Sequence, residues 1–64
     1  MKRKELIRIL ESKGCYLHRY GANHDIYSNP MNGSKAAVPS HNEIKNTIVL
    51  LILKQLGLPK SFNN

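Results

Sequence analysis

Features that define several common protein classes are scarce or missing in this sequence of 64 residues. Cys15 is its one cysteine, so neither an intramolecular disulfide nor a four-cysteine zinc site can form. A single free thiol is typical of the reducing cytoplasm, where we expect this chain to act. The longest apolar run, residues 48–53, is much shorter than the roughly 20 residues of a membrane-spanning helix. We therefore expect a cytoplasmic protein without a membrane segment.

Sequence patterns that hold cofactors are missing as well. No set of side chains has the spacing of a metal site, and no glycine-rich segment resembles a phosphate-binding loop. We therefore expect no cofactor and no metal. Acidic residues are also few, since four of them face ten lysines and arginines, for a formal net charge of +6. This excess of positive charge favours a polyanionic partner such as RNA, or an acidic protein.

Hydrophobic periodicity predicts a helix followed by three short strands. Apolar residues recur at helical spacing over 2–13, and Gly14 stands where a left-handed residue would end the helix. Alternating patterns then predict strands at 15–20, 24–29 and 35–38. In the first of these strands, strict alternation places the residue at position 19 on the same face as those at 15 and 17.

A second helix is predicted in the last third of the chain. Ser40 and Glu43 have the spacing of a capping box, which would start the helix there, and Thr47 is an alternative cap one turn later. Gly57 is expected to end the helix. Residues 59–64 are expected to form a loose tail of a single domain over 1–64.

This order of elements predicts the α+β class. The expected architecture is a small α-β-β-β-α sandwich, similar to double-stranded-RNA-binding domains, with a three-stranded antiparallel sheet. Both helices are expected on one face of the sheet, because that arrangement covers one face and builds one core.

Three segments resemble, in this order, the HicA family of messenger-RNA-cleaving toxins. The first is Gly-Cys-Tyr at 14–16, after the opening helix. The second is Gly-Ala-Asn-His-Asp-Ile-Tyr at 21–27, which is similar to the family's Gly-Ser-His segment and strand. The third combines 38–44 with 52–57, and it is similar to the family's Val-Pro-x-His segment and closing helix. The resemblance covers about residues 3 to 58.

The resemblance implies a toxin that cleaves messenger RNA and blocks translation. It aligns the family's catalytic histidine with His24, and it implies a HicB-type antitoxin as partner, in a complex that can be of higher order. Cleavage without a metal needs a base for the 2′-hydroxyl proton, an acid for the leaving oxygen and cations for the developing charge. Histidine suits both proton transfers because its ordinary pKa, about 6.5, keeps both forms accessible near neutrality.

Other residues are candidates for RNA contacts because they are basic or aromatic and lie in the predicted strands or near the second helix: Arg19, Lys35, Lys45 and Tyr27. A tyrosine can stack on an unpaired base. His41 belongs to the Pro-x-His segment. Its first interpretation is a local role, in which the side chain bonds the start of the second helix or packs on Pro39, and a phosphate contact is the second.

The second helix carries more apolar side chains than one buried stripe requires. Leu51 falls within that stripe, whereas Leu50 and Leu53 widen the apolar arc. Two interpretations stay open at this point. Either the helix is thoroughly buried, or Leu50 and Leu53 form an exposed strip that binds an antitoxin or a second copy of the chain.

Two other functions are weighed against the toxin. One is a non-catalytic RNA-binding module of the same fold, in which His24 is only a strand-end residue. A double-stranded-RNA binder would be expected to carry a lysine cluster at 41–47, where Lys45 stands alone. The other is a protein-interaction domain, which salt-dependent RNA binding would separate from the first two.

Overall fold

The computed structural model describes residues 1–59, and it confirms the predicted α+β class and the order α-β-β-β-α. The elements are α1 (Arg3–Ser12), β1 (Tyr16–Arg19), β2 (His24–Asn29), β3 (Ser34–Pro39) and α2 (Asn46–Gln55). Apart from its first residue, the predicted loose tail at 59–64 lies outside the described residues.

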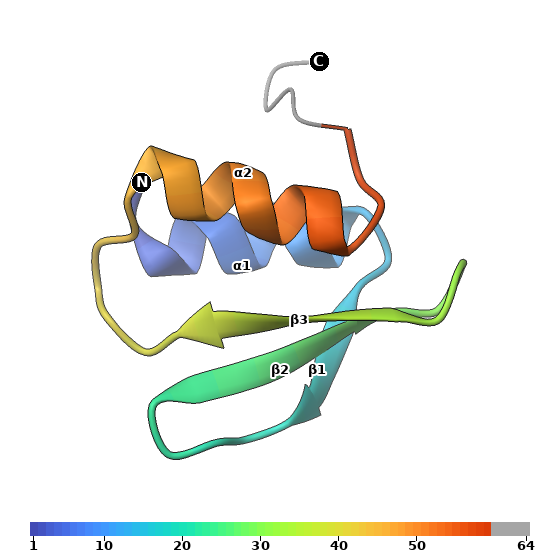
Figure 1. The fold of residues 1–64 in the computed structure, drawn as a ribbon, viewed down its shortest axis with the longest axis horizontal. Coiled ribbons are helices and arrows are strands. Elements are labelled where there is room, and N and C mark those ends of the chain that lie inside the picture. The colour runs from blue at the N-terminus through green and yellow to red at the C-terminus, as the bar shows by residue number, and fades with distance from the viewer. Residues whose placement is uncertain (60–64) are drawn as a thin grey trace.

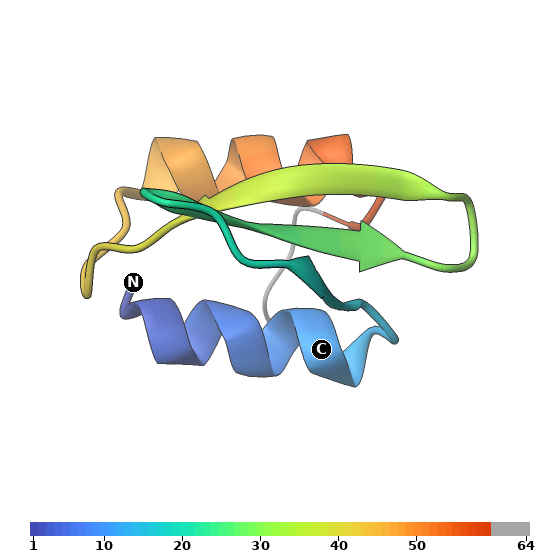
Figure 2. The same cartoon turned by 90° about the horizontal axis from the view of Figure 1, so that it is seen from below.

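The three strands form one antiparallel sheet in the order β1-β2-β3. Both helices lie on the same side of this sheet and run in the same direction, so the predicted placement is confirmed (Figure 1). Figure 2 looks at the opposite face of the sheet and shows the helices behind it, α1 toward β1 and α2 toward β3. Within residues 1–59, the helices therefore leave one face of the sheet uncovered, which we call the outer face.

The core lies between the helices and the inner face of the sheet. Each of its apolar members is at most 6% exposed: Leu6, Leu10, Cys15, Tyr27, Ala36, Val38, Ile44, Val49, Ile52, Leu53 and Leu56. On the inner face, Tyr27 pairs with Leu17 of β1 and with Ala36 of β3. This row places the tyrosine in the centre of the sheet, under both helices. No helix in the described part of the chain has the length and apolar character to cross a membrane.

The second helix begins later than the capping-box spacing predicts. Asn46 is its first residue, Lys45 precedes it without a side-chain cap, and the alternative cap Thr47 lies inside the helix. Glu43 instead pairs with Lys2 in an isolated antiparallel bridge. The expected helix start at 40–43 is therefore wrong, because this segment is used to hold the beginning of the chain.

A β-bulge in β1 changes the face that Arg19 occupies. Leu17 pairs with Tyr27 and Arg19 pairs with Ile26, which leaves His18 as the extra residue between them. Paired residues share a face of the sheet. Arg19 therefore lies beside Ile26 on the outer face, and the expectation that it shares a face with Leu17 is wrong.

Burial of Cys15 supplies a pH-dependent prediction. The thiol is 3% exposed, and burial raises its pKa above the ordinary value of 9.0. Its contribution to stability is complete below pH 9 and is lost as the pH rises toward the higher pKa of the folded state, because the unfolded thiol ionises first. We expect the free energy of unfolding, measured in urea between pH 8 and 10, to fall less steeply with pH in Cys15→Ala than in the wild type. The same slope in both proteins would contradict this account.

Candidate active site

His24 stands at one end of the sheet, on its outer face. It is the first residue of β2, it is exposed, and it pairs with Pro39, the last residue of β3. Side chains alternate along a strand, so His24 and Ile26 point away from the helices while Tyr27 points toward them. The imidazole is therefore open to a ligand that approaches the uncovered face.

The turn before His24 requires glycine at position 21. A β-carbon on Gly21 would collide with the carbonyl oxygen of His24. The Gly21 N–H also donates a hydrogen bond to Oδ1 of Asp25, at 3.3 Å. The close approach explains physically why a glycine begins the segment on which the family resemblance rests.

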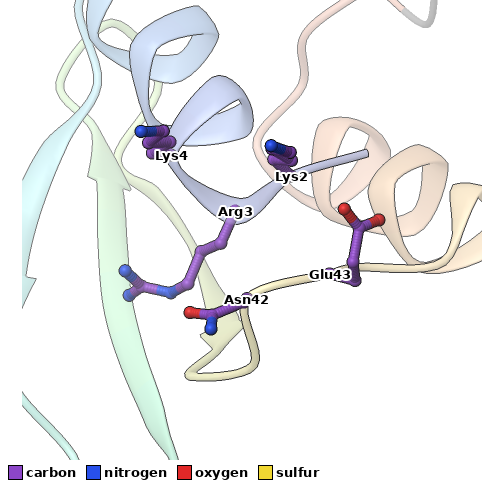
Figure 3. A pocket seen from close by; sticks show the side chains of 5 residues that line it. All are labelled: Lys2, Arg3, Lys4, Asn42 and Glu43. Atoms are coloured by element: carbon purple, nitrogen blue, oxygen red, sulfur yellow. The ribbon is translucent and has the colours of Figure 1, made fainter.

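Arg3 and Asp25 form an ion pair behind the histidine. Nη2 of Arg3 lies 2.6 Å from Oδ2 of Asp25, and Nε of Arg3 donates to the carbonyl oxygen of Pro39 at 2.8 Å. Figure 3 shows the Arg3 side chain reaching from the start of α1 toward the sheet. Neither residue was predicted from the sequence to belong to the site. The one local signal was an acidic residue next to the candidate histidine.

The segment with His41 lies at the same end of the molecule. The N–H of Ser40 donates to the carbonyl oxygen of Asn23 at 3.1 Å, which joins the residues that directly precede the two histidines. His41 is exposed, and it lies in the loop between β3 and α2. The helix begins five residues later, so the expectation that His41 bonds the helix start is wrong, whereas packing on Pro39 stays a prediction.

Cations gather around this end of the sheet. Lys2, Arg3 and Lys4 line a pocket of about 410 Å³ together with Asn42 and Glu43 (Figure 3). A second, smaller hollow is lined in part by His41 and Lys45 together with Pro39, the residue paired with His24. Two of the predicted RNA-contact residues, His41 and Lys45, are therefore brought together beside the strand pair that carries His24.

The other predicted cations lie farther along the outer face. Arg19 sits beside Ile26, two positions from His24, and Lys35 pairs with Ser28, four positions from it. At about 3.3 Å per residue, Lys35 is roughly 13 Å from the histidine along the strand. Arg19 is thus close enough to His24 for both side chains to contact the same part of a bound ligand, whereas Lys35 could contact only a more distant part.

Tyr27 does not fit its expected role in stacking on bases. It is 6% exposed on the inner face, and burial raises the pKa of its hydroxyl above the ordinary value. The outer face presents Tyr16 instead, which pairs with Ser28 and is 49% exposed. Alternation along a strand shows that neighbouring residues lie on opposite faces, but it does not show which face the helices cover.

The assignment of apolar residues on α2 also needs correction. Leu53 is 1% exposed and belongs to the core, so it cannot form the expected partner strip. Leu51, expected to be buried, is 48% exposed, and Leu50 is 37% exposed. The buried stripe consists of Val49, Ile52, Leu53 and Leu56. The exposed apolar pair on this helix is therefore Leu50 and Leu51.

Glutamine substitutions on α2 test this correction. We expect Leu53→Gln to lower the free energy of unfolding by about 2–5 kcal/mol, because it removes core contacts and buries an amide. Leu51→Gln should change it by less than about 0.5 kcal/mol, because its side chain is half exposed. Urea unfolding of both variants gives the comparison. Equal losses of stability would show that the two side chains are buried alike.

The structure defines a small, basic α+β domain that carries an exposed histidine at the end of its sheet, with cations beside it. A family model described as HicA toxin of bacterial toxin-antitoxin matches residues 3–58. The chain therefore belongs to the HicA toxin family, and the resemblance inferred from its motifs is confirmed. Comparisons with curated proteins and with solved structures gave no match.

Proposed function

We propose that this chain is an endoribonuclease toxin that acts in the cytoplasm, cleaves messenger RNA without a metal ion and so blocks translation. The observation that carries the proposal is the position of His24. It is exposed on the outer face, at the position that the family resemblance aligns with the catalytic histidine. Membership of the HicA toxin family supports the same function.

In the proposed reaction, the neutral imidazole of His24 takes the proton from a 2′-hydroxyl of the RNA. The resulting oxyanion attacks the adjacent phosphorus, and the bond from phosphorus to the 5′-oxygen breaks. The leaving oxygen takes up a proton from solvent and His24 returns its proton to solvent, so the products end in a 2′,3′-cyclic phosphate and a 5′-hydroxyl. Arg19, Lys45 and His41 are the proposed contacts to the phosphates nearest the reaction, and Lys35 is a more distant one.

The role of the 2′-hydroxyl can be tested directly. We expect the purified chain to cut a single-stranded RNA in the presence of a chelator and to leave DNA of the same sequence intact. A single 2′-deoxy substitution on the 5′ side of a mapped cut should abolish that cut alone. Cleavage of the DNA, or persistence of the cut in the substituted RNA, would contradict the proposed mechanism.

Family membership implies an antitoxin partner. We propose that this partner is of the HicB type, that it neutralises the toxin by covering His24 and the surrounding cations, and that higher-order complexes can form. Leu50 and Leu51, which are exposed on α2, offer an apolar contact for the same partner. The formal net charge of +6 favours an antitoxin with an acidic contact surface.

A further inference from the structure

We propose that the ion pair between Arg3 and Asp25 positions His24 by holding the backbone around it. This inference rests on the proposed role of His24 and assigns two positioning residues to the same site. In the sequence, Asp25 follows His24 directly, which would suit a carboxylate that contacts the imidazole. The pairing of β2 with β3 excludes that contact. Asp25 lies opposite Val38 of the core, and neighbouring residues of a strand point to opposite faces, so Asp25 and His24 point apart. Its effect on His24 must therefore pass through the backbone.

The contacts of the pair reach the backbone around His24 from three directions. Before the histidine, the Gly21 N–H donates to Oδ1 of Asp25 at 3.3 Å. After it, Asp25 itself is held by Nη2 of Arg3 at 2.6 Å. Across the sheet, Nε of Arg3 donates to the carbonyl oxygen of Pro39, the residue paired with His24, at 2.8 Å. One guanidinium thus connects both strands at the point where the histidine emerges.

Arg3 also connects the His24 segment to the loop that carries His41. Its backbone N–H donates to the carbonyl oxygen of Asn42 at 2.8 Å, while its side chain holds Asp25 and Pro39. The start of α1 therefore fixes the loop and the sheet end relative to each other. A ligand that spans the two histidines would meet a preorganised surface, which is what catalysis by proton transfer requires.

The geometry of the pair indicates positioning more than global stability. The side chains of Arg3 and Asp25 are 24% and 16% exposed, and ion pairs that retain contact with water add little to stability. Arg3 reaches two separate acceptors through two different nitrogens, which one ammonium group cannot reproduce. Arg3→Lys keeps the positive charge but has only one nitrogen to donate from. This variant therefore separates the effect of positioning from the effect of charge.

Cleavage kinetics of Arg3→Lys, Asp25→Asn and the double variant test the proposal. We expect kcat to fall by about tenfold in each single variant with KM within about twofold, because the RNA-facing charges stay in place. The double variant should be no slower than the slower single one, because both changes break the same pair. Arg8→Lys, on the exposed side of the same helix, is the matched control and should match the wild type.

A second measurement does not depend on catalysis. The Ser40 N–H bonds to Asn23 and touches neither member of the pair, so its hydrogen exchange reports on the sheet end. We expect Ser40 exchange to be about fivefold or more faster in both single variants, with the amide of Ile52 in α2 unchanged. If the wild type cuts no RNA, or if His24→Ala cuts it equally well, the proposed function fails. Ser40 exchange alone then decides the positioning role.

Four results would overturn the positioning role. The first is an unchanged kcat in active variants, and the second is a raised KM at unchanged kcat, which would make Arg3 an RNA contact. The third is unchanged Ser40 exchange, and the fourth is unfolding of both single variants. The last would make the pair an element of global stability. If only one variant unfolds, the other decides the question, because each breaks the same contact.

Discussion

Replacing His24 by alanine is expected to slow RNA cleavage by about 10²–10⁴-fold, the range over which a positioned acid or base accelerates a reaction. The side chain is exposed at the end of β2, so its removal leaves the core unchanged. Thermal unfolding of His24→Ala should therefore match that of the wild type. Cleavage is measured as a time course on a denaturing gel, with both proteins at the same concentration.

His18→Ala is the matched control for this prediction. His18 is the other strand histidine, it is exposed, and it occupies the bulge of β1. We expect His18→Ala to cleave RNA within about twofold of the wild type. A folded His24→Ala that is equally active would contradict the role of His24. Salt-dependent RNA binding without cleavage by any of the three proteins would favour the non-catalytic RNA-binding module instead.

Gly21→Ala is expected to reduce cleavage by about 10–10²-fold, although residue 21 does not itself touch the RNA in the proposed reaction. The new β-carbon would collide with the His24 carbonyl oxygen, so the turn must open and the histidine must shift. Displacements of about 1 Å at a catalytic group are enough for losses of this size. The measurement is kcat with the same RNA, together with the free energy of unfolding in urea.

Gly14→Ala separates loss of stability from loss of position. Gly14 has a φ of +90°, which an alanine adopts at a cost of about 1–2 kcal/mol, and it lies in the turn between α1 and β1. We expect this variant to be destabilised and to keep its activity at temperatures where it is folded. If Gly21→Ala lost no more activity than Gly14→Ala, the collision with His24 would have no catalytic consequence.

Local patterns were sufficient to predict the elements of this fold. The bounds of β2 match the expected strand at 24–29, and the other strands and the first helix differ from expectation by one or two residues. These elements depend on hydrophobic periodicity and on turn glycines, and both signals can be recognised within a few consecutive residues. The start of α2 was wrong because it depends on the bridge between Lys2 and Glu43, which are far apart in the chain.

Predicting the site was more difficult because it depends on contacts between distant segments. His24 was proposed from the motif around it, whereas the ion pair beside it joins Arg3 and Asp25, which are 22 positions apart. Tyr27 and Leu53 were misassigned because a periodic pattern shows that faces differ but not which of them the core covers. Arg19 changed face because one bulge residue breaks the alternation, and nothing in the local sequence marks a bulge there.

The most direct test of the account is the chemistry of the RNA ends. RNA cut in the presence of a chelator is analysed by mass spectrometry, for the wild type and for a folded His24→Ala variant. We expect 2′,3′-cyclic phosphate and 5′-hydroxyl ends with the wild type, and neither with His24→Ala. Ends with a 3′-hydroxyl, or cyclic phosphates formed equally by His24→Ala, would contradict a transesterification that depends on His24.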